Sequence, residues 1–452
     1  MTNYTRFSGR ASLAVIGKVM RKMGLWQVVE RHVQIRQKVI KHRPIDKLLD
    51  AFINILAGGH GLVEINTRVR SDLAVQRGFG RTACAEQSVV SDTLNVCTEE
   101  HVEQMRQALQ DILRSQSLAY AHKYGRAWQV LDVDTTGMPA GRQGEGVTKG
   151  YISSKRNVRG RQLGRVIATL YNEIVIERLY TGKIQLQSSL QELILAAEKV
   201  LMLNDRRREQ TIVRVDGGGG KDAHVNWLLG RGYAVLLKVK NWKRAAKLAH
   251  SVQTWHTDPK TGDREAGWVT APHAYIRPTR QLAVRTRKRG KWHHWVIVFA
   301  LSDQQIFYLL HQPLPSKLTS EQRLFAALHA YDLRSGGVET SNKGSKQGLG
   351  ITKRNKRSFT AQEMLVLLAQ LAYNLLTWVR VRLAPTRPSL QAYGPLRMVR
   401  DLFHIPGKLL LDAQGHVLEV VLSDRHCLAL PFLQAISPFL AGDDLVLNLG
   451  QI

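Results

Sequence analysis

Cysteine is scarce in this chain: only Cys84, Cys97 and Cys427 occur, and no two of them form a Cys-x-x-Cys pair. This spacing argues against a disulfide framework and against a zinc site built on cysteine. Long apolar runs are also missing, because no uncharged apolar stretch reaches about 18 residues and the first residues lack the apolar core of a signal peptide. We therefore expect a reduced, soluble, cytoplasmic protein with no membrane span.

Acidic residues are few relative to basic ones. Lys and Arg number 65 against 36 Asp and Glu, which gives a formal net charge of +29 at pH 7. Repulsion among this many positive charges destabilises a compact fold unless a polyanion neutralises them. Nucleic acid is the leading expected partner, because each neutralised phosphate releases a counterion, and a membrane surface is the second. The length of 452 residues predicts two or three domains.

Hydrophobic periodicity changes along the chain. Residues 1–120 show helical spacing, as in HRPIDKLLDAFINILAGG, where Pro44 opens a helix. From Ala127 onward, three β-rich runs (AWQVLDVD, GRVIATLYN and EIVIERLYTG) precede a helix, a strand, a helix and a strand. That order is the layout of an RNase H-like mixed sheet, although other α/β folds share it. The sequence therefore predicts an α/β protein with an RNase H-like core and an all-helical N-terminal domain.

The second half of the chain starts with a β-rich segment. Residues 241–312 alternate like strands, and QLAVRTRKRGKWHHWVIVFAL predicts a hairpin that turns near Arg289-Gly290. A later run, TAQEMLVLLAQLAYNLLTWVRVRL, predicts a core helix rather than a membrane span because polar residues interrupt it, namely Gln362, Glu363, Gln370 and Asn374. The tail GKLLLDAQGHVLEVVL predicts a hairpin.

These patterns predict five parts. A helical N-terminal domain covers residues 1–120, and a C-terminal hairpin and tail covers 401–452. Between them lies the core, in two segments (121–240 and 313–400) that the β-rich insertion (241–312) separates.

The segment IVRVDGGGGKD (212–222) places a carboxylate at the end of a buried strand and follows it with four glycines. A phosphate-binding Gly-rich loop needs a glycine six positions before the lysine and a Ser or Thr after it. Here those positions hold Val215 and Asp222, so that pattern fails. Asp216 is then the functional candidate, and the glycines allow backbone or substrate to approach it closely.

Two further segments carry candidate acids. In VLDVDTTGMP, Asp132 and Asp134 lie on one face of a strand, where two like charges raise a pKa or require a cation. The alternative is that Asp134 only ends the strand as a turn. In YDLRSGGVETSNKGSK, Glu339 is the only acid between Asp332 and Glu363, and the alternative is a solvated charge paired with Lys343.

Each of the three segments adjoins a basic window without acids, at residues 146–172, 266–302 and 340–362. A few acids in a basic surface are what a Mg²⁺-dependent enzyme acting on phosphodiesters needs. The windows supply candidate DNA contacts: Arg285, Arg287, Lys288, Arg289, Lys353 and Arg354. His293 and His294 are adjacent on a strand and point to opposite faces, so we assign no metal to them.

With these motifs the chain resembles the DDE transposases of bacterial insertion sequences, in the branch that carries a Tyr-Arg-Glu-Lys signature. The three acids match Asp134, Asp216 and Glu339, with Asp132 in reserve for the first. The signature matches Tyr331, Arg334, Glu339 and Lys346. Arg334 and Glu339 are separated by four residues, one more than the family pattern has, and Gly336-Gly337 supply the slack.

The resemblance implies a mechanism and partners. Three carboxylates would hold two Mg²⁺ ions, for which Mn²⁺ can substitute, and the enzyme would cleave transposon ends and transfer the 3′-OH into target DNA. Lys346 and Arg334 would grip phosphates with Tyr331 beside them, and a tryptophan (Trp268, Trp292 or Trp295) would stack on a flipped base. The N-terminal helices would recognise the terminal inverted repeats of double-stranded DNA. The protein would act as a homodimer on two ends, in the cytoplasm of a bacterium and associated with the nucleoid.

Two other functions remain open from the sequence. A non-catalytic, domesticated DNA-binding protein would use the positive charge to bind DNA and would have no catalytic activity. An RNase H-like structure-specific nuclease would keep the acids without strand transfer.

Overall fold

The computed structural model describes residues 2–152 and 155–452. Contacts divide the chain into two compact units. The central unit comprises Leu118–Gly137 and Thr148–Thr340. The terminal unit comprises Met1–Ser117, Met138–Val147 and Ser341–Ile452. Each unit has its own sheet and its own core, and each is described by itself below.

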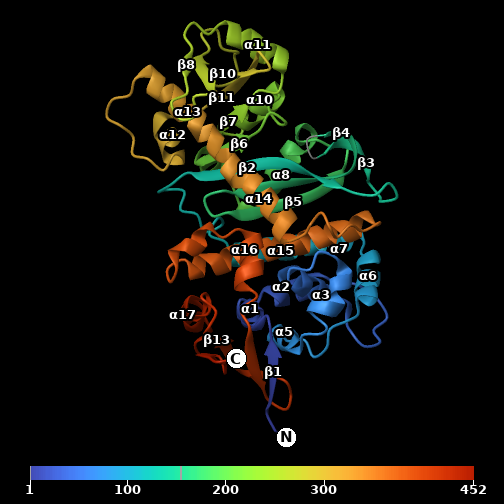
Figure 1. The fold of residues 1–452 in the computed structure, drawn as a ribbon. Helices are drawn as coiled ribbons and strands as arrows, with labels where there is room; N and C mark the ends of the chain where they lie inside the picture. Colours follow the sequence, from blue (N-terminus) through green and yellow to red (C-terminus); the bar gives the residue numbers. More distant parts are fainter. Residues whose placement is uncertain (1, 153–154) are drawn as a thin grey trace. The chain divides into compact units, whose positions relative to one another are not determined.

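A large mixed sheet forms the framework of the central unit, in the order β3-β4-β2-β6-β7-β11-β10-β9-β8 with β5 paired to the outside of β4 (Figure 1). Its first strands are β2 (Gln129–Pro139), β3 (Thr148–Ile152), β4 (Lys155–Ala168), β5 (Glu173–Thr181), β6 (Thr211–Val215) and β7 (Ala234–Lys238). The strand pairs β4–β5 and β3–β4 are antiparallel, whereas β2–β6 and β6–β7 are parallel. Strand β6 is buried along its whole length, as expected for a central parallel strand, and its one charged residue, Arg214, pairs with Asp132 of β2.

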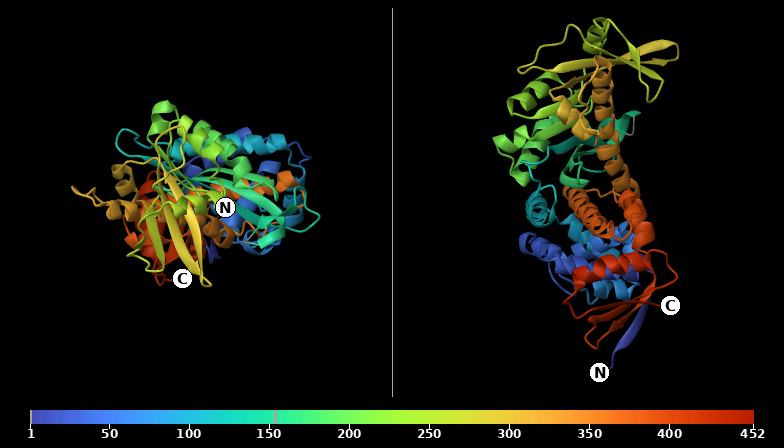
Figure 2. Two further views of the ribbon diagram at one scale, coloured as in Figure 1. Left: turned by 90° about the horizontal axis from the view of Figure 1, so that it is seen from above. Right: turned by 90° about the vertical axis from the view of Figure 1, so that its left-hand side faces the viewer.

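The β-rich insertion continues this same sheet. Strands β8 (His256–Thr257), β9 (Arg264–Trp268), β10 (Arg280–Lys288) and β11 (Lys291–Phe299) follow, and β11 pairs antiparallel with β7. The predicted hairpin is confirmed: β10 and β11 turn through Arg289 and Gly290, whose φ angles are +50° and +76°. Positive φ at both central positions is what a tight two-residue hairpin turn requires. The right-hand view of Figure 2 shows this hairpin in yellow.

Helices of the central unit pack on the sheet. They are α8 (Leu186–Leu201), α9 (Asp205–Glu209), α10 (Asp222–Gly230), α11 (Trp242–His250), α12 (Asp303–Leu309) and α13 (Ser320–Arg334), and α13 runs on into a π-helical turn, η2 (Ser335–Glu339). Helices α12 and α13 bury one apolar face against Val130, Ile212 and Leu236 of three adjacent strands. Side-chain capping boxes at Ser302 and Thr319 fix where the two helices start. The sheet thereby determines the position of α13. Helices α11 and α12 correct the expectation that residues 241–312 alternate like strands throughout.

The terminal unit is mainly helical. Its helices are α1 (Ala11–Lys22), α2 (Leu25–His32), α3 (Pro44–Leu56), η1 (Leu62–Glu64), α4 (Ile65–Arg68), α5 (Leu73–Gly78), α6 (Gln87–Asn95), α7 (Glu99–Gln116), α14 (Thr340–Gly348), α15 (Phe359–Leu383), η3 (Pro388–Ala392), α16 (Pro395–Arg397), η4 (Met398–Leu402) and α17 (Ala429–Leu440). Helix α15 is long and apolar enough to cross a membrane, but 89% of its most apolar window is buried inside the protein. Helices α3, α6, α7 and α17 pack around it. It is the core helix that its interrupting polar residues predicted.

A four-stranded sheet in the terminal unit corrects the expectation that residues 1–120 are all helical. Strand β1 (Tyr4–Ser8) pairs antiparallel with β12 (Gly407–Leu411), nearly the whole chain length away. The predicted terminal hairpin is present as β12 and β13 (Val417–Ser423), and β14 (Val446–Gly450) adds a parallel strand after α17. A strand of five residues is too short for its alternating pattern to be recognised in the sequence. Its partner is also distant in the sequence, so no neighbouring turn indicates the pairing. The five-part domain division stays a prediction.

Candidate active site

Two of the three candidate acids come from neighbouring parallel strands of the central unit. Val133 of β2 lies opposite Val215 of β6 in the parallel register. Asp134 and Asp216 each come one residue later, so they lie at the same level, just past the last paired residues; β6 ends there, whereas β2 continues to Pro139. The carboxyl edge of parallel strands is where α/β sheets place their ligands.

The glycines after Asp216 bring two pieces of backbone together. The N–H of Gly218 donates to Oδ1 of Asp216 at 2.7 Å, which fixes the carboxylate. The loop then passes the end of β7 so closely that a Cβ on Gly220 would lie 1.8 Å from the carbonyl oxygen of Lys238. The N–H of Lys240 donates to the Gly220 carbonyl at 3.0 Å. The glycines therefore serve a close backbone approach, as the sequence indicated.

The surroundings of Asp134 shift the pKa of its carboxyl group. Burial, together with the nearby carboxylate of Asp216, raises the pKa of Asp134 to about 7. The Glu339 carboxylate acts in the same direction, and the Arg334 guanidinium opposes it. Because three carboxylates and one guanidinium act on each other, the four side chains share one electrostatic site within the central unit. A carboxylate titrating near neutrality at a sheet edge is typical of a functional position.

Asp132, the reserve candidate, has a structural role. It is fully buried, and both of its oxygens accept hydrogen bonds from Arg214 of β6, at 2.6 and 2.8 Å. The Thr169 hydroxyl donates a third bond at 2.7 Å. These bonds neutralise the carboxylate and use both of its oxygens. We therefore keep Asp134 as the first acid.

The third acid reaches the site through a distortion of α13. Glu339 ends the π-helical turn η2, which inserts an extra residue into a helix that α14 then continues. This turn is the structural counterpart of the additional residue between Arg334 and Glu339. A Cβ on Gly337 would lie 2.5 Å from Oδ2 of Asp132, so glycine is needed where the turn presses against the sheet. The turn places Arg334 Nη2 at 3.0 Å from Oε1 of Glu339.

A hollow of about 360 Å³ lies over these residues. Its lining includes two of the acids and three residues that favour anions or stack: Asp216, Glu339, Lys238, Tyr331 and Arg334. The ring of Tyr331 lies 6.0 Å from that of Trp295, and the Lys238 ammonium lies 4.8 Å from the centre of the same Trp295 ring. Tyr331 and Arg334 of the signature are thus brought to the acids, whereas Lys346 lies on α14 in the terminal unit.

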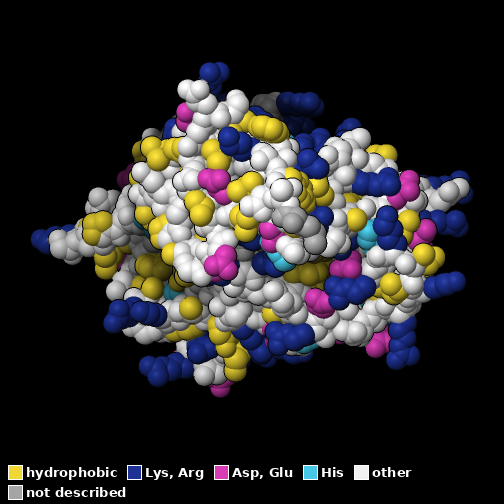
Figure 3. All heavy atoms as spheres, turned by 90° about the horizontal axis from the view of Figure 1, so that it is seen from below, with side chains coloured by type: hydrophobic (Ala, Val, Ile, Leu, Met, Phe, Trp, Pro, Cys, Tyr) yellow, Lys and Arg dark blue, Asp and Glu magenta, His cyan; other side chains and the backbone are white. Residues whose placement is uncertain are grey.

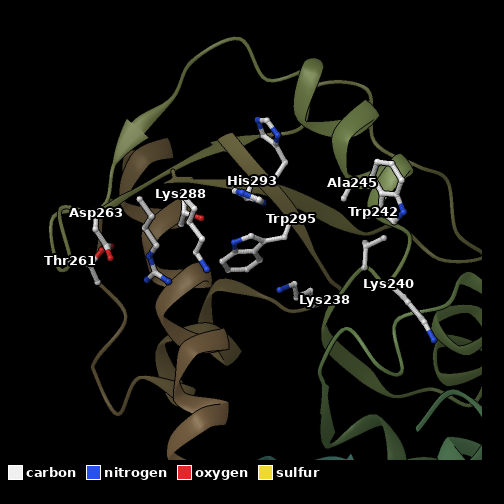
Figure 4. Close-up of a pocket in the computed structure, with 13 residues that line it drawn as sticks. Lys238, Lys240, Trp242, Ala245, Thr261, Asp263, Lys288, His293 and Trp295 are labelled. Atoms are coloured by element: carbon white, nitrogen blue, oxygen red, sulfur yellow. The ribbon is translucent and has the colours of Figure 1, made fainter. Parts of the chain in front are cut away.

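A second hollow of about 590 Å³ adjoins Lys238 and Trp295 (Figure 4). Figure 4 shows Trp295 and Trp242 on different sides of this pocket, with lysines at its margin. Its lining includes the cations Lys238, Lys240, Arg264 and Lys288. Sequence reasoning missed Lys238, Lys240 and Trp242. The signal was available, because YAVLLKVK is the next parallel strand and its end must lie beside Asp216.

The other tryptophan candidates differ in their surroundings. Trp292 is 41% exposed near the hairpin turn, with the guanidinium of Arg285 at 4.5 Å from its ring and that of Arg287 at 6.0 Å. Trp268 instead packs on Phe299 and donates its indole N–H to the Ser320 carbonyl at 3.2 Å. We interpret Trp268 as part of the core of the insertion.

The basic candidates also divide into exposed and structural residues. Lys and Arg side chains are widespread on the face of the molecule shown in Figure 3. Arg287, Lys288, Arg289 and Lys353 are at least partly exposed, and Arg285 pairs with Glu265 while still facing Trp292. Arg354 is different, because it is buried and donates to the carbonyl of Gly59 at 2.7 Å. We do not retain it as a DNA contact.

The donor set fits a hard divalent cation. Carboxylate oxygens are the ligands that Mg²⁺ prefers, and the mutual repulsion of Asp134 and Asp216 is what a cation would relieve. In the described part of the chain, no three His, Cys, Asp or Glu side chains are already grouped as a metal site. Of the three candidate acids, Glu339 is engaged in an ion pair with Arg334.

Comparison with known proteins identifies the family. A family model described as "Transposase DDE domain group 1" matches residues 5–428. The chain belongs to the DDE transposases. Among solved structures, this transposase is similar to the piggyBac transposase in a synaptic complex with hairpin DNA, at a TM-score of 0.50 and 10% identity, over 85% of this chain and 79% of that one. At this identity the likeness shows the fold alone, a mixed α/β fold with large mixed sheets. A search of the curated proteins found no match.

Two aspartates two residues apart should respond oppositely to neutralisation. Asp132→Asn leaves the Arg214 guanidinium buried without its counter-charge, so we expect a loss of about 3–5 kcal/mol in the free energy of unfolding. Asp134→Asn removes repulsion with Asp216 and should leave the transposase equally or more stable. Urea denaturation at pH 8 in EDTA measures both. Equal destabilisation by the two substitutions would contradict the separation of roles.

The pH dependence of stability should also reveal Asp134. Its pKa is raised from the ordinary aspartate value of 3.8 to about 7 in the folded protein, so between these values the folded state binds more protons than the unfolded state. The contribution of Asp134 to stability therefore falls as pH rises from about 4 to about 7 and is level above that. In EDTA, the melting temperature of the wild type minus that of Asp134→Asn should decrease across pH 5–7. A difference that stays constant or grows with pH would refute the assignment.

Proposed function

We propose that this transposase cleaves DNA at the ends of its element and transfers the resulting 3′-OH into target DNA, using Asp134, Asp216 and Glu339. The observation that carries the proposal is that Asp134 and Asp216 lie at the same level of adjacent parallel strands, just past the last paired residues, where Asp134 interacts electrostatically with Asp216 and with Glu339. The strand order β5-β4-β2-β6-β7, antiparallel and then parallel, supports an RNase H-like core for this chemistry.

The three carboxylates would hold two divalent cations, Mg²⁺ or Mn²⁺. When bound, such ions polarise the scissile phosphate and activate the attacking hydroxyl group. The chain's own groups do the remaining work. Lys238 and Arg334 face the hollow with positive charge and would bind phosphate oxygens beside the cut. Tyr331, packed on Trp295, would keep the strand in line, and Lys346 on α14 would bind a neighbouring phosphate.

The second hollow suits an unstacked nucleotide. Trp295 and Trp242 offer aromatic faces, and Lys238, Lys240 and Lys288 offer charge for the adjoining phosphates. Trp295 is therefore the preferred stacking residue and Trp292 the second. Arg285, Arg287, Arg289 and Lys353 would contact the DNA backbone, and the N-terminal helices would read the terminal repeats.

The assembly and its location follow from the same proposal. The similar piggyBac structure is described as a synaptic complex with hairpin DNA, which supports a DNA-bound homodimer holding two ends here. We propose a nucleoid-associated protein in the bacterial cytoplasm. A domesticated DNA-binding protein would not need the raised pKa of Asp134 or its position level with Asp216.

Asp216→Asn is the substitution that tests the proposal. It removes one charge and one metal ligand at nearly constant volume, so the fold should survive and DNA affinity should hold or rise. Cleavage with Mg²⁺ should fall by orders of magnitude, because the metal provides most of the charge stabilisation in the transition state. The assay follows end cleavage and strand transfer on duplexes with the repeats that flank the gene, with binding checked by gel shift.

Asp205→Asn is the matched control, because Asp205 is exposed on α9 and its ion pair is with Arg208, three residues later on the chain. It should cleave like the wild type. An Asp216→Asn protein that binds the duplex and still cuts at the wild-type rate would overturn the catalytic assignment. Cleavage without joining to target DNA would favour a structure-specific nuclease.

A further inference from the structure

Arg334 is a buried cation set among the acids of the site. Only 7% of its surface is exposed. Its guanidinium interacts favourably with the carboxylates of Asp134 and Asp216, and its Nη2 donates to Oε1 of Glu339 at 3.0 Å. Arg334 therefore supplies, from within the protein, positive charge of the kind that divalent ions would bring to the same carboxylates.

The contact between Arg334 and Glu339 is a product of the local fold. In an α-helix, residues five apart point to different sides, because each residue turns the helix by about 100°. The π-helical turn η2 changes this relation and brings residues 334 and 339 to one side. Gly337 allows the turn to press against Asp132 and Thr169 of the sheet. The pairing is thus built into the helix rather than left to two flexible side chains.

One nitrogen of the same guanidinium is left over. Among the residues that the structure describes, Nη1 of Arg334 is a buried polar atom without a hydrogen-bond partner. Leaving a buried charged donor unsatisfied costs free energy, so this position favours a ligand oxygen. Arg334 lines the hollow over Asp216 and Glu339, where such an oxygen would enter. A phosphate takes two N–H groups of an arginine at once and would compete with Glu339 for Nη2.

We propose that Arg334 is a positioning residue that acts through Glu339: it holds the third carboxylate in an ion pair until a DNA phosphate takes the guanidinium. Glu339 is then released to the metal ions. This inference rests on the proposed function and adds to it an order of assembly. DNA and metal should bind cooperatively, because each removes the ion pair that opposes the other, and the coupling must be equal in both directions.

The first test measures metal binding without DNA. Free Mn²⁺ is followed by electron paramagnetic resonance during titration of the full chain. Arg334→Met frees Glu339, so Mn²⁺ affinity should rise by roughly 5- to 150-fold, the range usual for coupling between sites. Arg334→Lys keeps the charge but not the fork and should give a smaller rise. Unchanged or weaker Mn²⁺ binding in a folded Arg334→Met protein would overturn the proposal.

Two controls separate this effect from a general loss of positive charge. Arg323→Met removes one charge from the same helix α13, where Arg323 pairs with Asp303 away from the acids, and should leave Mn²⁺ affinity unchanged. In a Glu339→Gln background, Arg334→Met should no longer tighten Mn²⁺ binding, because the gain acts through Glu339. A gain of the same size in that background would show simple charge removal and refute the positioning role.

The second test adds duplexes that carry candidate terminal repeats, in Ca²⁺-free buffer, with a methylene-phosphonate linkage at the cleavage position that keeps the phosphate charge and cannot be cut. In the wild type the duplex should raise Mn²⁺ affinity, and in Arg334→Met it should raise it far less. An equal effect in both proteins would refute release by phosphate. Asp216→Asn distinguishes failure of the proposed metal site from failure of the positioning role. If Asp216→Asn leaves Mn²⁺ binding intact in every background, the proposed metal site itself is wrong. If it weakens Mn²⁺ binding but Arg334→Met has no effect, only the positioning role is rejected.

Discussion

Charge compensation is the constraint on which the central unit depends. Carboxylates can meet at one edge of a buried sheet only if those around them are already neutralised, because an unpaired buried charge costs several kcal/mol. Arg214 neutralises Asp132 across adjacent strands, and Arg165 of β4 neutralises Glu177 of β5 with a bond of 2.8 Å from Nε. Asp134 and Asp216 come to the same level of the sheet, where burial and the nearby Asp216 carboxylate raise the pKa of Asp134 and the Arg334 guanidinium opposes the rise. The sheet thus brings two of the candidate acids together at a single place.

The same constraint explains why a helix had to deform. An acid delivered by α13 must come close to two carboxylates, and it can do so only with a cation beside it. The π-helical turn provides both at once, because it carries Glu339 toward the sheet edge and places Arg334 next to it. π-Helical turns inside α-helices are frequent at functional sites. Here the turn requires one extra residue and the glycines of Ser335–Glu339.

Features governed by local chemistry were predictable from the sequence. Strands β2, β4, β5, β6 and β7, helices α8 and α10, the hairpin turn at Arg289-Gly290 and the core helix α15 follow from periodicity and turn residues, whereas strand β3 and helix α9 were not predicted. Features that depend on distant partners were not. Strand β1 exists because β12 pairs with it, and the role of Asp132 depends on which residue of β6 lies opposite. The pattern DVD makes both aspartates candidates for the first acid. The strand register, which places Arg214 opposite Asp132, distinguishes them.

Basic runs show the same limit and refine how the net charge acts. The sequence treats Lys353 and Arg354 as equal members of one cationic window. The fold exposes Lys353 and buries Arg354 against the Gly59 carbonyl, where burial lowers the pKa of Arg354 to about 9. A buried guanidinium bonded to backbone releases no counterion when DNA binds, so it adds nothing to the salt dependence of affinity. The formal charge of +29 therefore overstates the charge available to phosphates. The cations that line hollows, among them Lys238, Lys240 and Lys288, are placed to position a DNA strand. The cations on the outer surface attract the DNA.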